Sequence, residues 1–133
     1  MTPKYYTPEI SEFHDQLEYE EWDLVWKKKV FDFRDLEIIH DELLEGKLRV
    51  KHLDREDIET LDWECKLFYQ SYNSGEFIIN NKYILIFNLI DSFCIIKHIN
   101  FPDHVEKNII SIFQGTIKNK SELKKLMVQL GIN

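Results

Sequence analysis

The sequence predicts an α+β fold made of an antiparallel β-meander sheet, an N-terminal hairpin, two short acidic helices and a C-terminal amphipathic helix. The first indication is composition, because 44% hydrophobic residues with only 4 Gly and 3 Pro exclude disordered and low-complexity classes. The second is a series of apolar runs separated by turn residues after residue 62. The third is an apolar stripe at helical spacing near the C-terminus. The 133 residues suit one core, so residues 1–133 are predicted to form a single domain.

The hairpin is predicted from residues 16–22 and 25–31, with residues 23–24 as its turn. This register places Glu20 opposite Lys27, so that opposite charges face each other across the two strands. Asp-Leu is an unfavourable two-residue turn, because such turns require positive φ values that Gly and Asn adopt most easily. A longer loop is therefore the alternative.

The two acidic helices are predicted from their caps and their apolar spacing. The first begins at Asp32 or Asp35 and is ended by Gly46, which adopts the left-handed conformation easily. The second is brief and begins at Asp54. Residues 48–52 form a predicted strand between them. Both helices are expected to present carboxylates to water.

The meander is predicted from five apolar segments. One of them is apolar at nearly every position, which predicts a central strand with both faces covered. Asn80 and Asn81 are predicted to form a two-residue turn, because Asn tolerates positive φ. Gly115 is predicted to break the last strand. The five predicted strands are residues 63–69, 77–79, 83–90 (the central one), 93–99 and 108–113.

The C-terminal helix is predicted from signals at both of its ends. Asn119 precedes Glu122 by three residues, which is the spacing of a capping box, and Gly131 ends the helix. The apolar stripe of this helix is expected to dock on the sheet. The stripe consists of Leu123, Leu126, Met127 and Leu130.

Targeting signals and catalytic motifs are missing from the sequence. No apolar run is long enough to span a bilayer and no signal-peptide core is found, so a cytoplasmic protein without a membrane span is expected. Cys65 and Cys94 lie in apolar runs, where a free thiol behaves as a small core residue. The five His residues lack metal-ligand spacing, and no nucleophile-elbow, phosphate-loop or dinucleotide motif occurs. The sequence therefore predicts a protein that is not an enzyme and that holds no metal or other cofactor.

Charge is distributed unevenly along the chain. Residues 1–62 carry 9 Lys/Arg and 18 Asp/Glu, a net charge of −9, whereas residues 63–133 carry 8 and 6, a net charge of +2. We expect this difference to place opposite electrical signs on opposite parts of the molecule, the alternative being that the charges only mark solvated faces. The total of −7 argues against direct binding of nucleic acid, because it does not attract phosphates.

The first candidate site joins a basic helix start to aromatic side chains of the meander. Free backbone N–H groups, the positive end of the helix dipole, lysines and a hydroxyl converge at residues 116–121, which suits a small anion. Aromatic faces can stack on a ring of the same ligand. The alternative is that the lysines only keep a turn soluble and the aromatic side chains fill the core. The predicted ligand-binding residues are Lys118, Lys120, Ser121, Lys124, Tyr69 and Tyr72.

The second candidate site is an acidic surface in the first half of the chain. Such a surface would dock on a basic host protein, imitating DNA, by an attraction that weakens as salt rises. The predicted protein-binding residues are Glu37, Asp41, Glu45, Glu56 and Glu59. The open edges of the predicted meander also make a homodimer an expectation.

A likeness to known proteins spans most of the chain. It is carried by residues 48–59, 63–66 and 115–126 and by the opening segments 5–8, 11–14 and 18–20. In these segments the sequence resembles a family of short uncharacterised proteins from Bacteroidales bacteria and their phages. The resemblance implies a phage or mobile-element accessory protein, and it implies no activity or catalytic residues. In that context the expected function is sequestration of a small anionic, nucleotide-like signal of host defence at the first candidate site.

Overall fold

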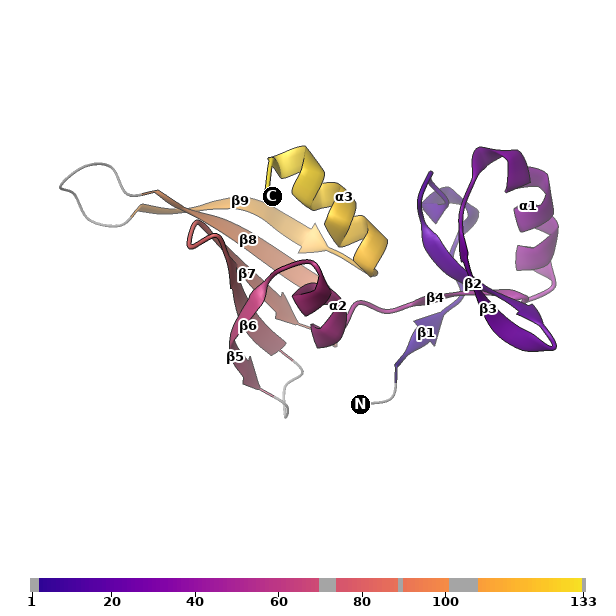
Figure 1. Ribbon diagram of the computed structural model, residues 1–133, viewed down its shortest axis with the longest axis horizontal. Coiled ribbons are helices and arrows are strands. Elements are labelled where there is room, and N and C mark those ends of the chain that lie inside the picture. Colours follow the sequence, from indigo (N-terminus) through magenta and orange to yellow (C-terminus); the bar gives the residue numbers. More distant parts are fainter. Residues whose placement is uncertain (1–2, 70–73, 89, 101–107, 133) are drawn as a thin grey trace. The chain divides into compact units, whose positions relative to one another are not determined.

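The computed structural model describes residues 3–69, 74–88, 90–100 and 108–132 (Figure 1). These residues form two antiparallel sheets and three α-helices, which confirms the predicted α+β class. The chain divides into two compact units. The first unit consists of residues 1–52 and 119–126, and the second consists of residues 53–118 and 127–133. The single domain expected from the sequence stays a prediction.

The sheet of the first unit has four antiparallel strands in the order β1-β4-β2-β3. The two-residue β1 and the six-residue β3 are therefore its edge strands. The predicted strand at residues 48–52 is found as β4, one residue shorter. The strands are β1 (Tyr5–Tyr6), β2 (Glu18–Asp23), β3 (Val25–Val30) and β4 (Leu48–Lys51).

The predicted hairpin is confirmed as β2 and β3, but its predicted register is wrong by one residue. Leu24 alone separates the paired residues Asp23 and Val25, and its φ is +64°. Lys27 therefore lies opposite Glu21, and not opposite Glu20 as predicted. A shift of one residue exchanges the faces of a strand, so it decides which side chains lie together.

The first acidic helix, α1 (Leu36–Leu44), follows a 3-10 turn that begins after Asp32. The Asp32 side chain accepts a hydrogen bond from the backbone N–H of Arg34 at 2.9 Å. Gly46 follows the helix with a φ of +71°, as its predicted role in ending the helix requires. Both predicted ends of this helix are thus found within one or two residues.

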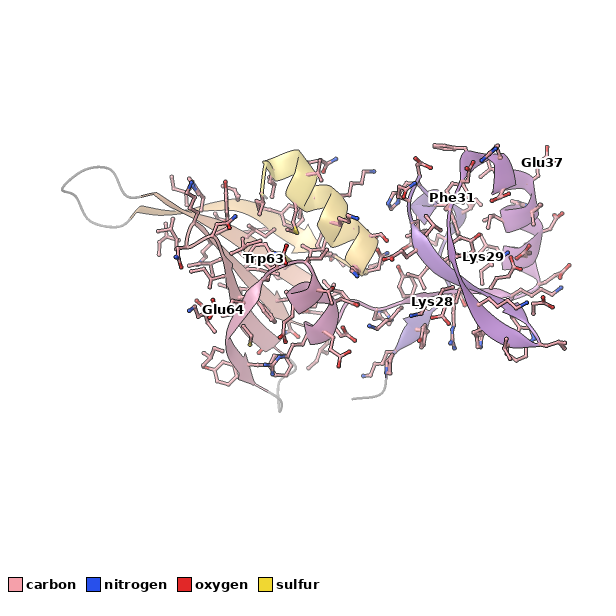
Figure 2. All side chains as sticks on the ribbon, in the orientation of Figure 1. Lys28, Lys29, Phe31, Glu37, Trp63 and Glu64 are labelled. Atoms are coloured by element: carbon pink, nitrogen blue, oxygen red, sulfur yellow. The ribbon has the colours of Figure 1, made fainter. Side chains whose placement is uncertain are left out.

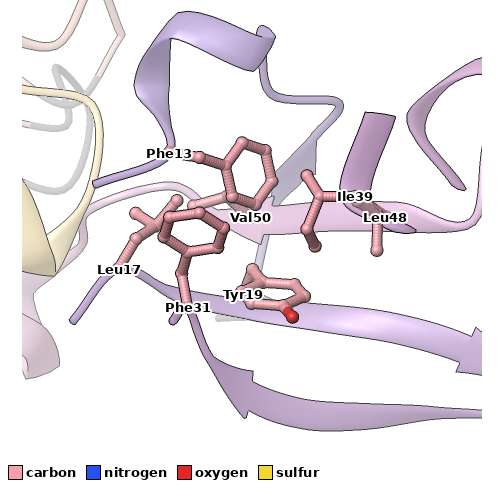
Figure 3. Close-up of a cluster of buried hydrophobic side chains, with 7 residues drawn as sticks. All are labelled: Phe13, Leu17, Tyr19, Phe31, Ile39, Leu48 and Val50. Carbon is pink, nitrogen blue, oxygen red and sulfur yellow. The ribbon is translucent and has the colours of Figure 1, made fainter. Parts of the chain in front are cut away.

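The core of the first unit lies between the inner face of this sheet, α1 and the segment before β2 (Figure 3). Tyr19 points from β2 toward Ile39 of α1, and the aromatic rings of Phe13 and Phe31 meet edge to face at 5.3 Å. Alternation along β4 buries every second residue. The core consists of Phe13, Leu17, Tyr19, Phe31, Ile39, Leu48 and Val50.

The start of the C-terminal helix α3 (Lys120–Leu130) belongs to the first unit. The Asn119 side chain accepts from the backbone N–H of Glu122 at 2.9 Å, which confirms the predicted cap. Its Nδ2 donates to the Tyr6 hydroxyl at 3.0 Å, and that hydroxyl donates to Glu12 at 2.9 Å. Burial is the largest cause that raises the pKa of Tyr6. The helix cap is therefore connected to strand β1 through a neutral tyrosine.

The second unit contains the predicted meander, a five-stranded sheet in the order β5-β6-β7-β8-β9. Its strands are β5 (Glu64–Tyr69), β6 (Ser74–Ile79), β7 (Tyr83–Asn88), β8 (Phe93–Asn100) and β9 (Asn108–Thr116). The run predicted to be central is β7, the middle strand. Leu85 and Phe87 are fully buried, but Ile84 and Ile86 on the other face are only half-buried, so coverage of both faces is incomplete.

Two predicted details of the meander are corrected. The turn between β6 and β7 has three residues, not two, because Ile79 pairs with Tyr83. Asn80 and Asn81 do have the predicted positive φ values, +56° and +55°. Gly115 does not break the last strand but lies within β9, paired with Cys94. A Cβ at this position would lie 3.0 Å from Phe113 Cζ, so the glycine leaves room for that ring.

The second acidic helix, α2 (Arg55–Thr60), is capped as predicted by Asp54, whose side chain accepts from the backbone N–H of Asp57 at 2.9 Å. Trp63 belongs to the buried residues of the second unit and is 2% exposed. Its Nε1 donates to the Met127 sulfur at 3.3 Å, which joins the end of α3 to the residue preceding β5. This contact supports docking of the end of the helix, which carries Met127 of the stripe, within the second unit.

Leu24→Asn is expected to raise the free energy of unfolding by about 0.5–1 kcal/mol, because Asn adopts positive φ at a lower cost than Leu. The Leu24 side chain is 88% exposed, so its loss removes little packing. Urea denaturation measures the change. Val25→Asn, in the neighbouring strand position, is the control and should be destabilising. A lower stability for Leu24→Asn would contradict the one-residue turn.

Gly75→Ala is expected to lower the free energy of unfolding by about 1–3 kcal/mol through overpacking. A Cβ at this buried position would lie 2.9 Å from Phe68 Cδ2 and 3.1 Å from the Leu67 carbonyl oxygen. Lys66→Ala on the exposed surface of the adjacent strand β5 is the control, with an expected change within about 0.5 kcal/mol. If the two variants were equally stable in urea, a Cβ at position 75 would be tolerated, and the overpacking argument would be contradicted.

Candidate functional site

The predicted ligand-binding residues of α3 lie at its start, in the first unit. Lys120 is half-buried and Lys124 is exposed. Ser121 is buried, and its hydroxyl accepts a hydrogen bond from the backbone N–H of Glu18 at 3.0 Å. Since Asn119 already caps the helix, the groups that were expected to bind an anion make structural contacts here.

The other predicted ligand-binding residues belong to the second unit or lie outside the described residues. Tyr69 ends β5, one edge strand of the five-stranded sheet, and Lys118 follows β9, the opposite edge strand. The Lys118 carbonyl accepts from the backbone N–H of Leu53 at 2.8 Å. Tyr72 lies outside the described residues. Neither unit by itself brings the predicted set together, and the site stays a prediction.

The predicted acidic surface is also divided between the units. Glu37, Asp41 and Glu45 are exposed along and just after α1 in the first unit. Glu56 and Glu59 are exposed on α2 in the second unit. Glu45 forms an ion pair with a lysine at 2.6 Å and Glu59 with an arginine at 2.6 Å, and Asp41 Oδ1 lies 3.9 Å from the Nδ1 of His40.

The charge difference between the two halves of the sequence does not carry over to the two units. The first unit contains 11 Lys/Arg and 14 Asp/Glu, a net charge of −3, and the second contains 6 and 10, a net charge of −4. The expectation of opposite signs on opposite parts is therefore wrong. The reason is that three lysines of α3 join the acidic N-terminal segment, while the acidic residues 54–62 join the meander.

The outer face of the four-stranded sheet carries a row of aromatic and cationic side chains. The Arg49 guanidinium carbon lies 3.6 Å from the ring centroid of Tyr5 and 4.1 Å from that of Trp26. Its Nη2 donates to Glu20 Oε1 at 2.8 Å. The rings of Trp26 and Trp22 lie 5.4 Å apart. These contacts join all four strands on the face that points away from the core.

The register adds one exposed cation to this face, because Lys28 lies opposite Glu20. Figure 2 labels Lys28 and its neighbour Lys29, which alternate between the two faces of β3. We call the outer set the aromatic face. It consists of Tyr5, Glu20, Trp22, Trp26, Lys28 and Arg49.

The aromatic face can bind a ring and an anion together. Trp22 is 45% exposed and offers a surface on which a planar ring can stack. The Arg49 guanidinium is covered by two rings and neutralised by Glu20, so it positions the rings and does not act as a free cation. Lys28 is exposed and can approach a phosphate or carboxylate. This face was not predicted from the sequence, although Trp22 and Trp26 are a signal for it, because the predicted register places these two residues on different faces.

The opposite face of β2 carries a carboxyl pair. The carboxyl of Glu42 on α1 interacts with the carboxylate of Glu21 on β2, and Lys29 Nζ lies 3.3 Å from Glu21 Oε1. The Glu42 Oε2 atom is buried and has no hydrogen-bond partner among the described residues. Burial, followed by the Glu21 carboxylate, raises the pKa of Glu42 to about 7. Burial and the same carboxylates raise the pKa of the adjacent Tyr19 to about 12.

In the part of the chain that the structure describes, no three His, Cys, Asp or Glu side chains gather in an arrangement that could hold a metal ion. No helix there has the length and the apolar character needed to cross a bilayer. Cys94 is fully buried and Cys65 partly so, and burial raises the pKa of the Cys94 thiol to about 12. The cytoplasmic location stays a prediction.

The raised pKa of Glu42 predicts that stability falls as pH rises. The folded chain holds this proton more tightly than the unfolded chain, so the stabilisation is complete below about pH 4.5 and is lost as pH rises through about 7. Glu42→Gln stays neutral at every pH, so the variant should be more stable than the wild type at pH 8 by about 1 kcal/mol, a value discounted for partial exposure. Urea denaturation between pH 5 and about 8 measures this difference.

Glu37→Gln on the exposed side of α1 is the control for that experiment, and its stability should follow the wild type across the pH range. If the stability of Glu42→Gln showed the same pH dependence as that of the wild type, the raised pKa of Glu42 would be contradicted.

The chain matches no protein-family model, and comparisons with curated proteins and with solved structures gave no match. The resemblance to the family from Bacteroidales bacteria and their phages stays a prediction, since none of the three comparisons bears on it.

Proposed function

We propose that this chain is a non-enzymatic binding protein that takes up an anionic, ring-bearing ligand of the nucleotide type on its aromatic face. The observation that supports this function is the row of Trp22, Trp26, Arg49 and Tyr5 beside the exposed Lys28. Stacking on an aromatic side chain contributes about 1–3 kcal/mol per base and tolerates different bases. An ammonium group beside the stack adds attraction to phosphate.

The site is organised before the ligand arrives. Arg49 is clamped between two rings and held by a carboxylate, so the side chains that support Trp26 lose little further freedom on binding. Because the unit as a whole carries a net charge of −3, long-range attraction of polyanions is weak and a small ligand is favoured over a nucleic-acid strand. The phage resemblance adds the specific proposal that the ligand is a host-defence signal and that the protein sequesters it.

Isothermal titration of the full chain with a panel of cyclic and linear nucleotides tests this function. At least one nucleotide should bind, and Trp22→Ala should weaken its binding by about tenfold or more through loss of stacking. Lys28→Gln should weaken binding of the nucleotide more than binding of the corresponding nucleoside.

Two matched variants control for aromatic and cationic side chains elsewhere. Phe33→Ala removes an exposed ring outside the aromatic face, and Lys124→Gln removes a lysine of the site predicted from sequence. Neither should change the affinity. No heat with any nucleotide would remove the proposed function, and loss of binding in Lys124→Gln alone would move the site from the aromatic face to the start of α3.

A further inference from the structure

Strand β3 leaves one side of its backbone open. It is the last strand in the order β1-β4-β2-β3 (Figure 1), and five of its six side chains are exposed. Phe31 N–H donates to the Leu17 carbonyl at 2.8 Å. Because hydrogen-bonded and non-hydrogen-bonded pairs alternate in an antiparallel ladder, Val25, Lys27 and Lys29 bond to β2. The N–H and C=O groups of Trp26, Lys28 and Val30 therefore point away from β2.

The open edge carries three consecutive lysines between two exposed valines. Val25 is 58% exposed and Val30 is 52% exposed, with residues 27–29 between them. Lys27 and Lys29 make ion pairs with β2 at 3.0 and 3.3 Å, and such surface pairs contribute only about 0–1 kcal/mol. Lys28 is exposed on the outer face. The edge thus has a definite pattern, in which positive charge is central and apolar side chains lie at both ends.

The strand that already pairs with β3 shows which chemistry suits it. Strand β2 carries Glu18, Glu20, Glu21 and Asp23, and it places carboxylates against the lysines across the ladder. A second copy of β3 would instead place lysines opposite lysines, which is a common protection of edge strands against self-association. The same lysines that repel a second copy of β3 attract a strand that carries negative charge.

We propose that the open edge of β3 binds an extended acidic segment of a partner protein as a fifth, antiparallel strand of this sheet. Main-chain hydrogen bonds to Trp26, Lys28 and Val30 provide the attachment, as in other cases of strand addition. Carboxylates at the centre of the segment meet residues 27–29, and apolar residues at its ends meet Val25 and Val30. This interaction uses the main-chain groups along the edge of the sheet, and it shares the Lys28 side chain with ligand binding on the outer face.

The chain itself supplies the probe for the experiment. A peptide with the sequence of residues 17–24, Leu-Glu-Tyr-Glu-Glu-Trp-Asp-Leu, has acidic residues between apolar ends. Labelled peptide is titrated into the full chain and followed by fluorescence anisotropy. It should bind at least about tenfold tighter than a control peptide in which every acidic residue is replaced by lysine. Binding should weaken as salt rises.

Variants of the chain test the edge itself. Lys28→Glu should weaken peptide binding by about tenfold, because it reverses the charge at the centre of the edge without removing an ion partner of β2. Lys125→Glu makes the same change on the exposed part of α3 and should leave binding unchanged. Equal binding of the acidic and the charge-reversed peptides, or equal effects of the two variants, would overturn the proposal.

Amide hydrogen exchange distinguishes strand addition from other modes of binding. Bound peptide should slow exchange at Trp26, Lys28 and Val30 and leave Val25 and Lys27 unchanged, because only the first three point outward. Faster exchange at Val25 and Lys27 would show that the peptide has displaced β2, and no change at any of these amides would show that it binds elsewhere. Either result would overturn the proposal.

Discussion

The conformation of a single residue, Leu24, fixes the arrangement on which the functional surfaces of the first unit depend. Its positive φ closes the β2–β3 hairpin with one residue, and this turn sets the pairing of all six residues in each strand. With this pairing, Trp22, Trp26 and Lys28 share the outer face with Glu20, while Tyr19, Glu21 and Lys29 face α1. A different turn would exchange these sets, because strand side chains alternate with a period of two. The aromatic face and the ion pair of Lys29 with Glu21 are thus two consequences of one backbone angle.

The physical cost of that angle explains why sequence patterns did not locate it. Leucine disfavours the left-handed region by about 1–2 kcal/mol, so a turn there is not expected from propensity. Charge pairing did not help, because both registers place carboxylates opposite lysines, Glu20 and Lys27 in the predicted one and Glu21 and Lys27 in the observed one. Where a local signal was unambiguous, the prediction held. The caps at Asp54 and Asn119 depend only on residues within one helical turn, and both are found.

The candidate sites were harder to predict than the fold, because they depend on contacts between distant segments. Arg49 meets Tyr5, Glu20 and Trp26, which come from three other strands. Nothing in the local sequence of β4 distinguishes this arginine from a solvated one. The prediction of opposite charges on the two parts of the molecule was wrong for a related reason. The chain returns to its first unit at residue 119, so a boundary drawn at one point along the sequence does not separate the two packed units. The order of the strands in the meander sheet, in contrast, is the same as their order in the sequence, and it was therefore predictable.

The lysines of β3 combine protection and recognition in one feature. An open edge strand exposes main-chain groups to any extended segment, and charged residues restrict which segments can approach. Three lysines in succession place positive charge on both faces of the strand, so the restriction does not depend on which face of an incoming strand carries its charges. Repulsion rejects basic strands and copies of the chain, whereas attraction to acidic strands follows from the same Coulomb interaction with the sign reversed. An edge protected by one sign of charge is therefore also selective, and the acidic composition of β2 shows the kind of strand that it accepts.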